Sequence, residues 1–350
     1  MVATAGKDAG TLIKSVHTKG NVMKVARLII AATALLMSSV SYAEDKSLSI
    51  MLDWTPGPMH GPIYWAQKEG MFKKRGLDLK ILSPSDTTVP LKLVATGNVD
   101  LAISYSTETI LASKEGVDVT IVGTVIPRPL IAIMATASQG MTDIKDLRGK
   151  KVGYSGIPTY LALLKATIEN AGLAEDDVEI VNVGFNLVPA LLSGSVDAIG
   201  DGFVNAQAVQ IEQQTGQKPF VRPVDQAGVP TYDENVLVAD PGRLASNEEY
   251  RDTVKLFLDA FYEGVAEANK RPAEVTALLE TVTNRDADYL RGSVPISLEM
   301  MLPEKGPLGC VEVSKYETFS GWMVQHKLID AKPELDRLID NSLLPETCSE

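Results

Sequence analysis

Few residues in this sequence have the type and spacing that catalysis or metal binding requires. Beyond residue 43 the only histidines are His60 and His326, and no Cys-x-x-Cys, His-Glu-x-x-His or Gly-x-Ser-x-Gly motif occurs. A metal centre or a nucleophile triad therefore lacks its parts. Gly153 and Gly156 fall in a predicted strand-to-helix turn, but without the spacing of a dinucleotide-binding loop. We expect no catalytic residue, no metal and no bound cofactor.

Polar and aromatic side chains instead recur just after the predicted strands. They are Asp53, Trp54, Tyr105, Glu108, Ser155, Gly156, Thr159, Asp201, Phe203 and Asn205. In open α/β sheets, ligands bind outside the carboxyl ends of the strands. Each residue alone has a structural alternative: Trp54 can belong to the core, Glu108 can favour a helix start, and Asp201 can cap a helix. Their common placement predicts a single ligand-binding cleft.

The segment after the predicted strand at residues 151–154 offers polar groups that could bind a ligand. Ser155, Gly156 and Thr159 offer amides and hydroxyls where a helix is predicted to begin, and Pro158 suits the first helical turn. A polar or anionic ligand group is favoured at such a position. The alternative is that the glycines serve only the turn.

Strand-like and helix-like segments alternate in two series. The first has strands at 49–52, 77–82, 100–105 and 119–125, and helices at 62–69, 89–95 and 107–114. The second has strands at 151–154, 178–183, 198–199 and 220–223, and helices at 159–170 and 205–215. This alternation predicts mainly parallel sheets with helices on both faces.

Two extended apolar tracts separate the two series. The tract 126–135 is interrupted by Pro127 and Pro129, and the tract 235–238 leads into a helical region that begins near residue 246. An α/β block between two such crossings indicates an inserted lobe. We therefore predict an α/β protein of two lobes, residues 46–130 with 236–350 and residues 131–235, joined by two hinge strands.

The N-terminal residues have the pattern of a secretory signal. Lys24 and Arg27 precede an apolar run at 28–37, and small residues stand at Ser41 and Ala43. The run is shorter than the ~20 residues that a membrane anchor needs. We predict a signal peptide at about 23–43, preceded by an extension at 1–22, and a periplasmic location. No cysteine near Ala43 could accept a lipid anchor.

The net charge of the chain bears on the kind of partner it can bind. The chain has a net charge of −12, and without residues 1–43 it has 28 basic against 44 acidic residues, a net charge of −16. Such an acidic surface argues against a nucleic-acid partner.

An exported chain meets oxidising conditions, so Cys310 and Cys348 are candidates for a disulfide; two unpaired thiols are the alternative. We expect a monomer.

Several stretches resemble a known family. MLDWTPGPMHGPIYWAQKEGMFKKRGLDL, ATGNVDLAISY and LRGKKVGYSG are similar to periplasmic solute-binding proteins of the sulfonate and thiamine-precursor (SsuA/THI5-like) type. The resemblance covers most of residues 47–245. It implies a type II periplasmic binding-protein fold, and an ABC-transporter permease with its ATPase as partners. The motif DWTP with the following His60 most resembles carriers of thiamine pyrimidine precursors, with riboflavin carriers close behind. We therefore count His60 among the expected ligand-binding residues.

The residues and the resemblance together suggest how an aminopyrimidine thiamine precursor would bind. Trp54 would stack on the ring opposite Phe203, and Asp53, Glu108 and Asp201 would accept hydrogen bonds from amino groups. Residues 200–204 contain one aromatic ring, fewer than pyrimidine carriers of this type tend to have.

Three alternatives remain open. An alkylsulfonate or nitrate carrier would need a cation, for which Arg128 is the obvious candidate. A pyrimidine synthase of the same superfamily would need a cysteine-rich tract that this chain lacks. A secreted sensor would present its ligand to a receptor.

Overall fold

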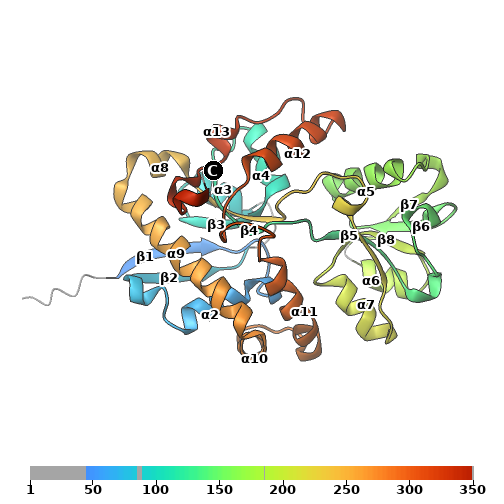
Figure 1. Cartoon of the computed structure of the whole chain (residues 1–350), viewed down its shortest axis with the longest axis horizontal. Coiled ribbons are helices and arrows are strands. Elements are labelled where there is room, and N and C mark those ends of the chain that lie inside the picture. The colour runs from blue at the N-terminus through green and yellow to red at the C-terminus, as the bar shows by residue number, and fades with distance from the viewer. Residues whose placement is uncertain (1–44, 85–88, 185, 349–350) are drawn as a thin grey trace, which may run out of the picture. The chain divides into compact units, whose positions relative to one another are not determined.

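The first of two five-stranded sheets is built from both ends of the described chain. A computed structural model describes residues 45–84, 89–184 and 186–348, so the predicted signal peptide lies outside the described residues. The sheet has the order β2-β1-β3-β10-β4. Strands β1 to β4 are labelled in Figure 1. Its strands are β1 (Lys46–Met51), β2 (Leu77–Leu82), β3 (Leu101–Tyr105), β4 (Thr120–Ile126) and β10 (Asn235–Ala239). β1 is parallel to β2 and β3, whereas β10 runs antiparallel to β3 and β4.

The second sheet has the order β7-β6-β8-β5-β9. Its strands are β5 (Ile131–Ala135), β6 (Lys151–Tyr154), β7 (Glu179–Asn182), β8 (Ala198–Phe203) and β9 (Phe220–Pro223). β6 is parallel to β7 and β8, and β5 is antiparallel to β8 and β9. Each sheet is therefore mixed. The strand that enters from the other sheet runs antiparallel to its neighbours, and it is β10 in the first sheet and β5 in the second.

Two segments cross between the sheets. Residues 127–130 connect β4 to β5 and form the first crossing segment, and residues 227–234 lead into β10 and form the second. The extended tracts expected at 126–135 and 235–238 are thus present as strands with short connections. The division into two lobes that move against each other remains a prediction.

Helices connect the strands and form the C-terminal third. The α-helices are α2 (Gly61–Lys68), α3 (Val89–Ala95), α4 (Ser106–Lys114), α5 (Pro158–Asn170), α6 (Leu187–Leu192), α7 (Gln207–Thr215), α8 (Pro241–Ser246), α9 (Glu248–Lys270), α10 (Pro272–Val282), α11 (Ala287–Met300), α12 (Val313–Gln325) and α13 (Leu335–Leu338). The 3-10 turns are Pro58–His60, Lys73–Arg75, Ala137–Gln139, Ile144–Leu147, Glu175–Asp177, Val224–Gln226, Asn341–Leu343 and Glu346–Cys348. Within the described residues, no helix combines the length and apolarity that a membrane crossing requires.

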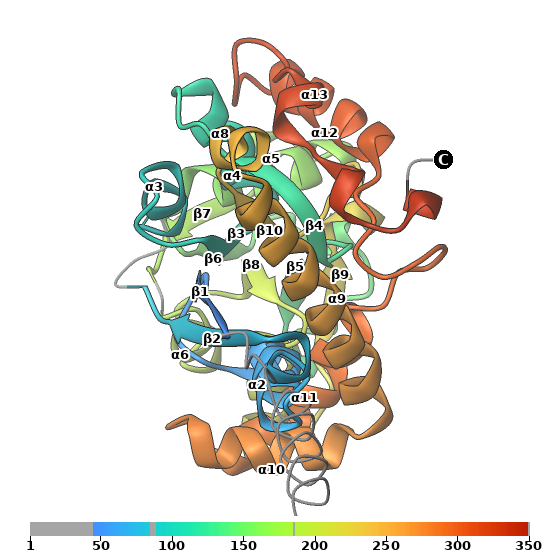
Figure 2. The ribbon, with the colours of Figure 1, turned by 90° about the vertical axis from the view of Figure 1, so that its left-hand side faces the viewer.

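Helices pack on both faces of the first sheet (Figures 1 and 2). On one face lie α2 and α9, where Phe257 of α9 stacks on Phe72 at a centroid distance of 5.5 Å. On the other face lie α3, α4 and α12, where Phe319 of α12 packs on Tyr232 at 4.5 Å. Within the helical region expected after residue 246, Val254, Phe257, Leu258, Phe261 and Val265 recur at helical spacing and lie on the buried face of α9. Burial on both faces explains the continuous apolar strands.

Strand β8 is longer than its sequence indicates. It was expected to end at Ile199, but it continues through Gly200, Asp201 and Gly202 to Phe203. A Cβ atom at Gly200 would lie 2.6 Å from Leu164, and one at Gly202 would lie 2.8 Å from the Met134 sulfur. These glycines allow close packing on both sides of the strand, and their presence hides the strand pattern.

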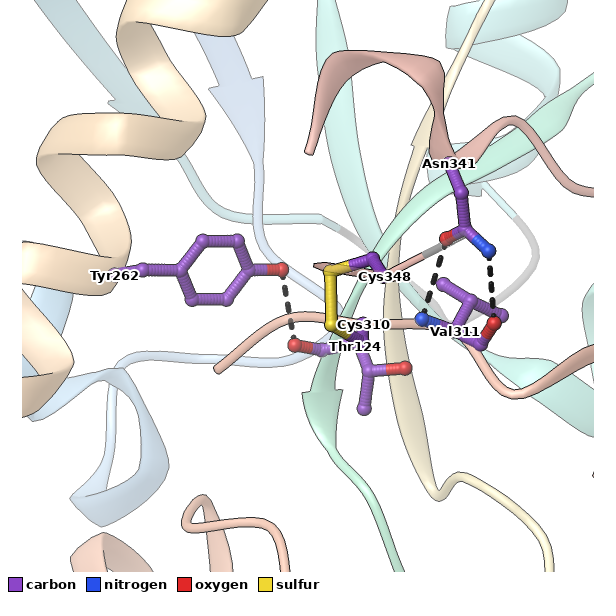
Figure 3. Close-up of a disulfide and its surroundings, with 6 residues drawn as sticks. All are labelled: Thr124, Tyr262, Cys310, Val311, Asn341 and Cys348. Carbon is purple, nitrogen blue, oxygen red and sulfur yellow. Dashed lines mark hydrogen bonds between the residues drawn. A yellow bond between two sulfur atoms is a disulfide. The ribbon is translucent and has the colours of Figure 1, made fainter. Parts of the chain in front are cut away.

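The C-terminal segment covers the edge of the first sheet (Figure 3). Cys310 and Cys348 form a disulfide. Beside it, the amide of edge-strand residue Thr124 donates to the Gly309 carbonyl at 2.9 Å, and Ile339 forms a parallel bridge with Ile121. The open edge of β4 is therefore paired with the chain's own C-terminal residues, which protects it from other strands.

Candidate ligand-binding site

The first part of the candidate site is a buried carboxylate just after β1. Asp53 is held by His60, whose Nε2 lies 2.9 Å from Asp53 Oδ1, and both side chains are almost fully buried. The His60 Nδ1 accepts the Gly57 amide at 3.1 Å. Because Nδ1 is an acceptor, the ring proton is on Nε2 and is donated to Asp53. His60 therefore orients Asp53, and we assign it no direct ligand contact.

Strands β3 and β10 add two polar side chains beside Asp53. Asn235 is the first residue of β10 and is paired in register with Tyr105 at the end of β3. The Asn235 Nδ2 donates to Asp53 Oδ2 at 3.4 Å, and its Oδ1 is buried without a hydrogen-bond partner among the described residues. Burial, and next the charge of Asp53, raise the pKa of Tyr105 well above its usual value. The Tyr105 phenol therefore stays protonated.

The second crossing segment supplies a carboxyl group that the sequence analysis did not single out. Glu234 is buried, and its Oε2 accepts the Leu130 amide of the first crossing segment at 2.8 Å. Burial raises the pKa of Glu234 to about 7, against the opposing effect of hydrogen bonds from Leu130 and Tyr232. A group that titrates near neutral pH and is fixed between the two crossing segments can either accept or donate a hydrogen bond.

Tyr160 of α5 brings the acids of both sheets together. Its phenol is buried, and burial raises its pKa well above the usual value. The charges of Glu234, Glu108, Asp201 and Asp53, in that order, raise it further. Four carboxyl groups from different elements therefore lie within electrostatic reach of one ring. That they line one ligand-binding cleft remains a prediction. Tyr160 itself was missed because its apolar neighbours in helix 159–170 suggest a core position.

Asp201 and Ser155 form a pair between the adjacent parallel strands β6 and β8 of the second sheet. The Ser155 amide donates to Asp201 Oδ2 at 2.9 Å, and the Ser155 hydroxyl donates to the same oxygen. Burial raises the pKa of Asp201, although both bonds from Ser155 act in the opposite direction. The second oxygen, Oδ1, is buried without a partner among the described residues. Asp201 is thus part of β8 rather than a helix cap.

Phe203, Gly156 and Thr159 are the other predicted residues in this part of the chain. The Phe203 ring lies 6.3 Å from the Tyr160 ring, tilted by 59°. Gly156 has a φ of 88°, and a Cβ atom there would lie 2.8 Å from Asn182 Nδ2, so the position requires glycine. Thr159 is half-buried in the first turn of α5.

The loop after β1 carries the exposed aromatic residue. The Trp54 side chain is 41% exposed, and Glu108 in the first turn of α4 is half-buried. Arg285 fixes the loop, because its Nη2 donates to Thr55 Oγ1 at 2.7 Å and its Nε donates to the Pro56 carbonyl at 3.3 Å. Trp54 therefore stands, partly exposed, on an anchored loop.

Asn205 has a different role from the one its position suggested. Its Nδ2 donates to Ser297 Oγ at 3.0 Å, and its carbonyl accepts the Ser293 hydroxyl. Both serines are buried on α11. Asn205 therefore connects the β8–α7 turn to a helix of the C-terminal region. Its Oδ1 is buried without a partner among the described residues, and a ligand contact of Asn205 remains a prediction.

Arg128 also has protein partners. Its Nη2 donates to the Leu302 carbonyl at 2.6 Å, and it lines a pocket that contains Asp225, Glu304 and Glu312. An anion in that pocket would meet these three carboxylates as well as Arg128 and Lys315. Within the described residues no group of three His, Cys, Asp or Glu side chains could hold a metal ion.

Comparison with known proteins gives this arrangement a family. The sequence model described as NMT1/THI5 like matches residues 57–275. The chain belongs to the NMT1/THI5-like family. A formylaminopyrimidine-binding protein of Halalkalibacterium halodurans is 31% identical over 318 residues, which cover 88% of this chain and 94% of that protein.

The family also contains enzymes. The 4-amino-5-hydroxymethyl-2-methylpyrimidine phosphate synthase of Legionella pneumophila is 29% identical over 235 residues, 66% of this chain and 72% of that enzyme. Membership of the NMT1/THI5-like family therefore leaves both a binding protein and a synthase to be weighed.

Solved structures establish the fold. The structure of the periplasmic aliphatic sulphonate binding protein SsuA of Escherichia coli superposes on this chain with a TM-score of 0.65 and 16% sequence identity. The superposition covers 84% of this chain and 92% of the SsuA chain. This NMT1/THI5-like chain has the type II periplasmic binding-protein fold, as the family resemblance implied.

Proposed function

We propose that this protein is the periplasmic binding component of an ABC importer and that its ligand is an aminopyrimidine precursor of thiamine, of the hydroxymethyl or formylamino type. It would deliver the ligand to a membrane permease driven by an ATPase. Binding would close residues 131–235 onto residues 46–130 and 236–350 by a hinge at the two crossing segments. The formylaminopyrimidine-binding relative supports the ligand class.

The single observation that carries the proposal is the acid cluster around Tyr160, with Glu234 in it. An aminopyrimidine has an amino group that donates and a ring nitrogen that accepts. A protonated carboxyl group matches both, because its O–H donates to the ring nitrogen while its other oxygen accepts from the amino group. The pKa of about 7 makes the protonated form of Glu234 available near neutral pH. Affinity should therefore fall as the pH rises above this value.

The aromatic residues suit the faces of the same ring. Trp54 is exposed on its fixed loop, and Phe203 lies against Tyr160. Aromatic pairs contribute about 0.5–1.5 kcal/mol beyond the burial of area. Stacking alone is too weak for tight binding, so the carboxyl groups must supply the specificity.

The same cluster disfavours an anionic ligand. Burying a sulfonate or nitrate beside Asp53, Asp201 and Glu234 is costly without a cation, and Arg128 is directed to the Leu302 carbonyl. A synthase remains the second candidate because of the synthase relatives. Against it stand the two cysteines, which are joined in a disulfide and offer no cysteine-rich tract.

Calorimetric titration of the purified protein tests the proposal. We expect a hydroxymethyl- or formylaminopyrimidine to bind, and taurine, nitrate and riboflavin to give no heat. Glu234→Leu and Trp54→Ala should each weaken binding, while the melting temperature of the unliganded Trp54→Ala variant stays nearly unchanged. Glu234→Gln, whose amide keeps one donor and one acceptor, should still bind, with an affinity that no longer falls as the pH rises. Binding of taurine or nitrate that Arg128→Ala abolishes would replace the aminopyrimidine assignment with the anion carrier. Conversion of the ligand to a phosphorylated pyrimidine would favour the synthase.

A further inference from the structure

A buried ion pair lies next to the candidate site but outside it. Asp233 directly precedes Glu234 and is 1% exposed at its side chain, and its partner Lys315 on α12 is 10% exposed. The Lys315 Nζ lies 2.7 Å from Asp233 Oδ1. Removing two charges from water costs several kcal/mol per ion, so a buried pair of this kind contributes little to net stability. Its presence points to a geometric role.

Lys315 contacts both crossing segments. In addition to Asp233 in the second segment, its Nζ donates to the Pro127 carbonyl in the first at 3.0 Å. The other oxygen of Asp233, Oδ2, accepts the Thr124 hydroxyl at 2.8 Å and the Tyr316 hydroxyl at 3.1 Å. Every oxygen of the Asp233 carboxylate is thus held by a residue of β4 or α12, and one ammonium group joins the two connections.

The main chain of the same segment is fixed to the start of α4. The Ser106 hydroxyl donates to the Asp233 carbonyl, and the Ser106 amide donates to the Glu234 carbonyl at 3.2 Å. The Glu234 amide donates to the Ile126 carbonyl at 2.9 Å. With the Asp233 side chain held on one side and these bonds on the other, the Glu234 side chain is directed toward the Leu130 amide.

We propose that Asp233 and Lys315 are positioning residues, which hold the two crossing segments in the arrangement that presents Glu234 to the ligand. Neither residue contacts the ligand. The inference rests on the proposed function for its ligand, but the arrangement of Glu234 can be tested without one.

The first test uses ligand affinity. Lys315→Met should bind the aminopyrimidine about tenfold more weakly, an effect of the size found for residues that act on a site without touching its ligand. Lys315→Arg retains a cation with donors for both acceptors and should restore most of the affinity. Asp233→Asn should weaken binding as well, and the double variant Asp233→Asn/Lys315→Met should be no weaker than the worse single variant, because the two residues act as one unit.

The matched control is an exposed ion pair of the same C-terminal region. Arg337 lies 3.1 Å from Asp118, with side chains 71% and 62% exposed. Arg337→Met should leave affinity unchanged. If Lys315→Met binds as wild type does, or if Lys315→Arg is as weak as Lys315→Met, the positioning role is wrong although the proposed function stands.

The second test needs no ligand. Hydrogen exchange of the Leu130 amide, which donates to Glu234, should be faster in Lys315→Met than in wild type and Lys315→Arg, while β1 amides exchange at the wild-type rate. Unchanged Leu130 exchange would overturn the proposal. If wild-type protein binds no aminopyrimidine, the proposed function fails, and the Leu130 exchange still decides the positioning role.

Discussion

At the scale of single residues, the candidate site contains carboxyl groups in three different environments. Asp53 is oriented by His60, Asp201 is held by Ser155 with one oxygen unpaired, and Glu234 is buried with a pKa of about 7. These differences come from neighbours that are distant in sequence. A carboxyl group in a loop therefore cannot be assigned a protonation state from its sequence position alone.

The buried Glu234 makes stability depend on pH. Its pKa is raised from 4.5 to about 7, so the folded protein keeps a proton that the unfolded chain releases between these values. Glu234 therefore lowers the free energy of unfolding progressively as the pH rises from about 4.5 to about 7. Glu234→Gln removes this dependence. Relative to wild type, the variant should gain up to about 3 kcal/mol between pH ~4 and pH ~8.

Urea unfolding of the unliganded wild type and Glu234→Gln at the two pH values measures this gain. Comparing the difference at each pH cancels any constant effect of the amide, such as an altered bond to the Leu130 amide. A stability difference that is the same at both pH values would contradict the raised pKa.

Part of the site could be predicted from the sequence. Asp53, Tyr105, Glu108, Ser155, Asp201 and Phe203 were chosen because they follow strands, and the structure places them around Tyr160 or Asp53. Whether they bind a ligand remains a prediction. The sequence analysis does not single out Glu234, Asn235 and Tyr160. Glu234 precedes a strand, Asn235 begins that strand, and Tyr160 lies on a helix. The run Asp233-Glu234-Asn235 before an apolar strand was the available signal, since acids rarely occur where a strand enters a core.

At the scale of elements, the alternating pattern predicted most strands and helices with ends within a few residues. The direction of β5 and β10 could not be read from it. Side chains alternate along a strand in the same way whichever direction the strand runs. The pattern therefore predicts mainly parallel sheets and does not show that β5 and β10 run antiparallel to their neighbours. The predicted end of β8 is too early for another reason. Its two glycines pack against Leu164 and Met134, and glycines at such close contacts do not show the apolar pattern of a strand.

Contact between α2 and α9 gives a prediction at this scale. A Cβ atom at Gly264 of α9 would lie 2.7 Å from the Ala66 Cβ and 3.0 Å from the Pro62 carbonyl oxygen of α2. Gly264→Ala should therefore destabilise the protein by about 1–3 kcal/mol, although alanine in a helix interior is intrinsically favoured by about 1 kcal/mol. Thermal unfolding measures the effect. The exposed α9 variant Asp259→Ala is the control and should change stability little, and a Gly264→Ala protein as stable as wild type would show that the helices can move apart.

At the scale of the whole molecule, the disulfide joins two distant parts of the C-terminal region. Cys310 and Cys348 are separated by 38 residues. Closing a loop of this size restricts the unfolded chain and stabilises the protein by about 4 kcal/mol on the chain-entropy model. The double variant Cys310→Ser/Cys348→Ser should lose stability of this order in urea unfolding. Reduced wild-type protein should match the variant, and equal stability of oxidised wild type and variant would show that the bridge constrains little.

The order of strands in the first sheet has a consequence for how the chain folds as it is made. After β1 to β4 have been synthesised, β3 and β4 are still separated by the place that β10 will occupy. Both have an unpaired edge until residue 239 exists, and β4 has one until the segment around Ile339 reaches it. Unpaired edges attract wrong partners. The sheet that begins with the first described residues is therefore completed among the last, and a nascent chain must be kept from pairing in the meantime.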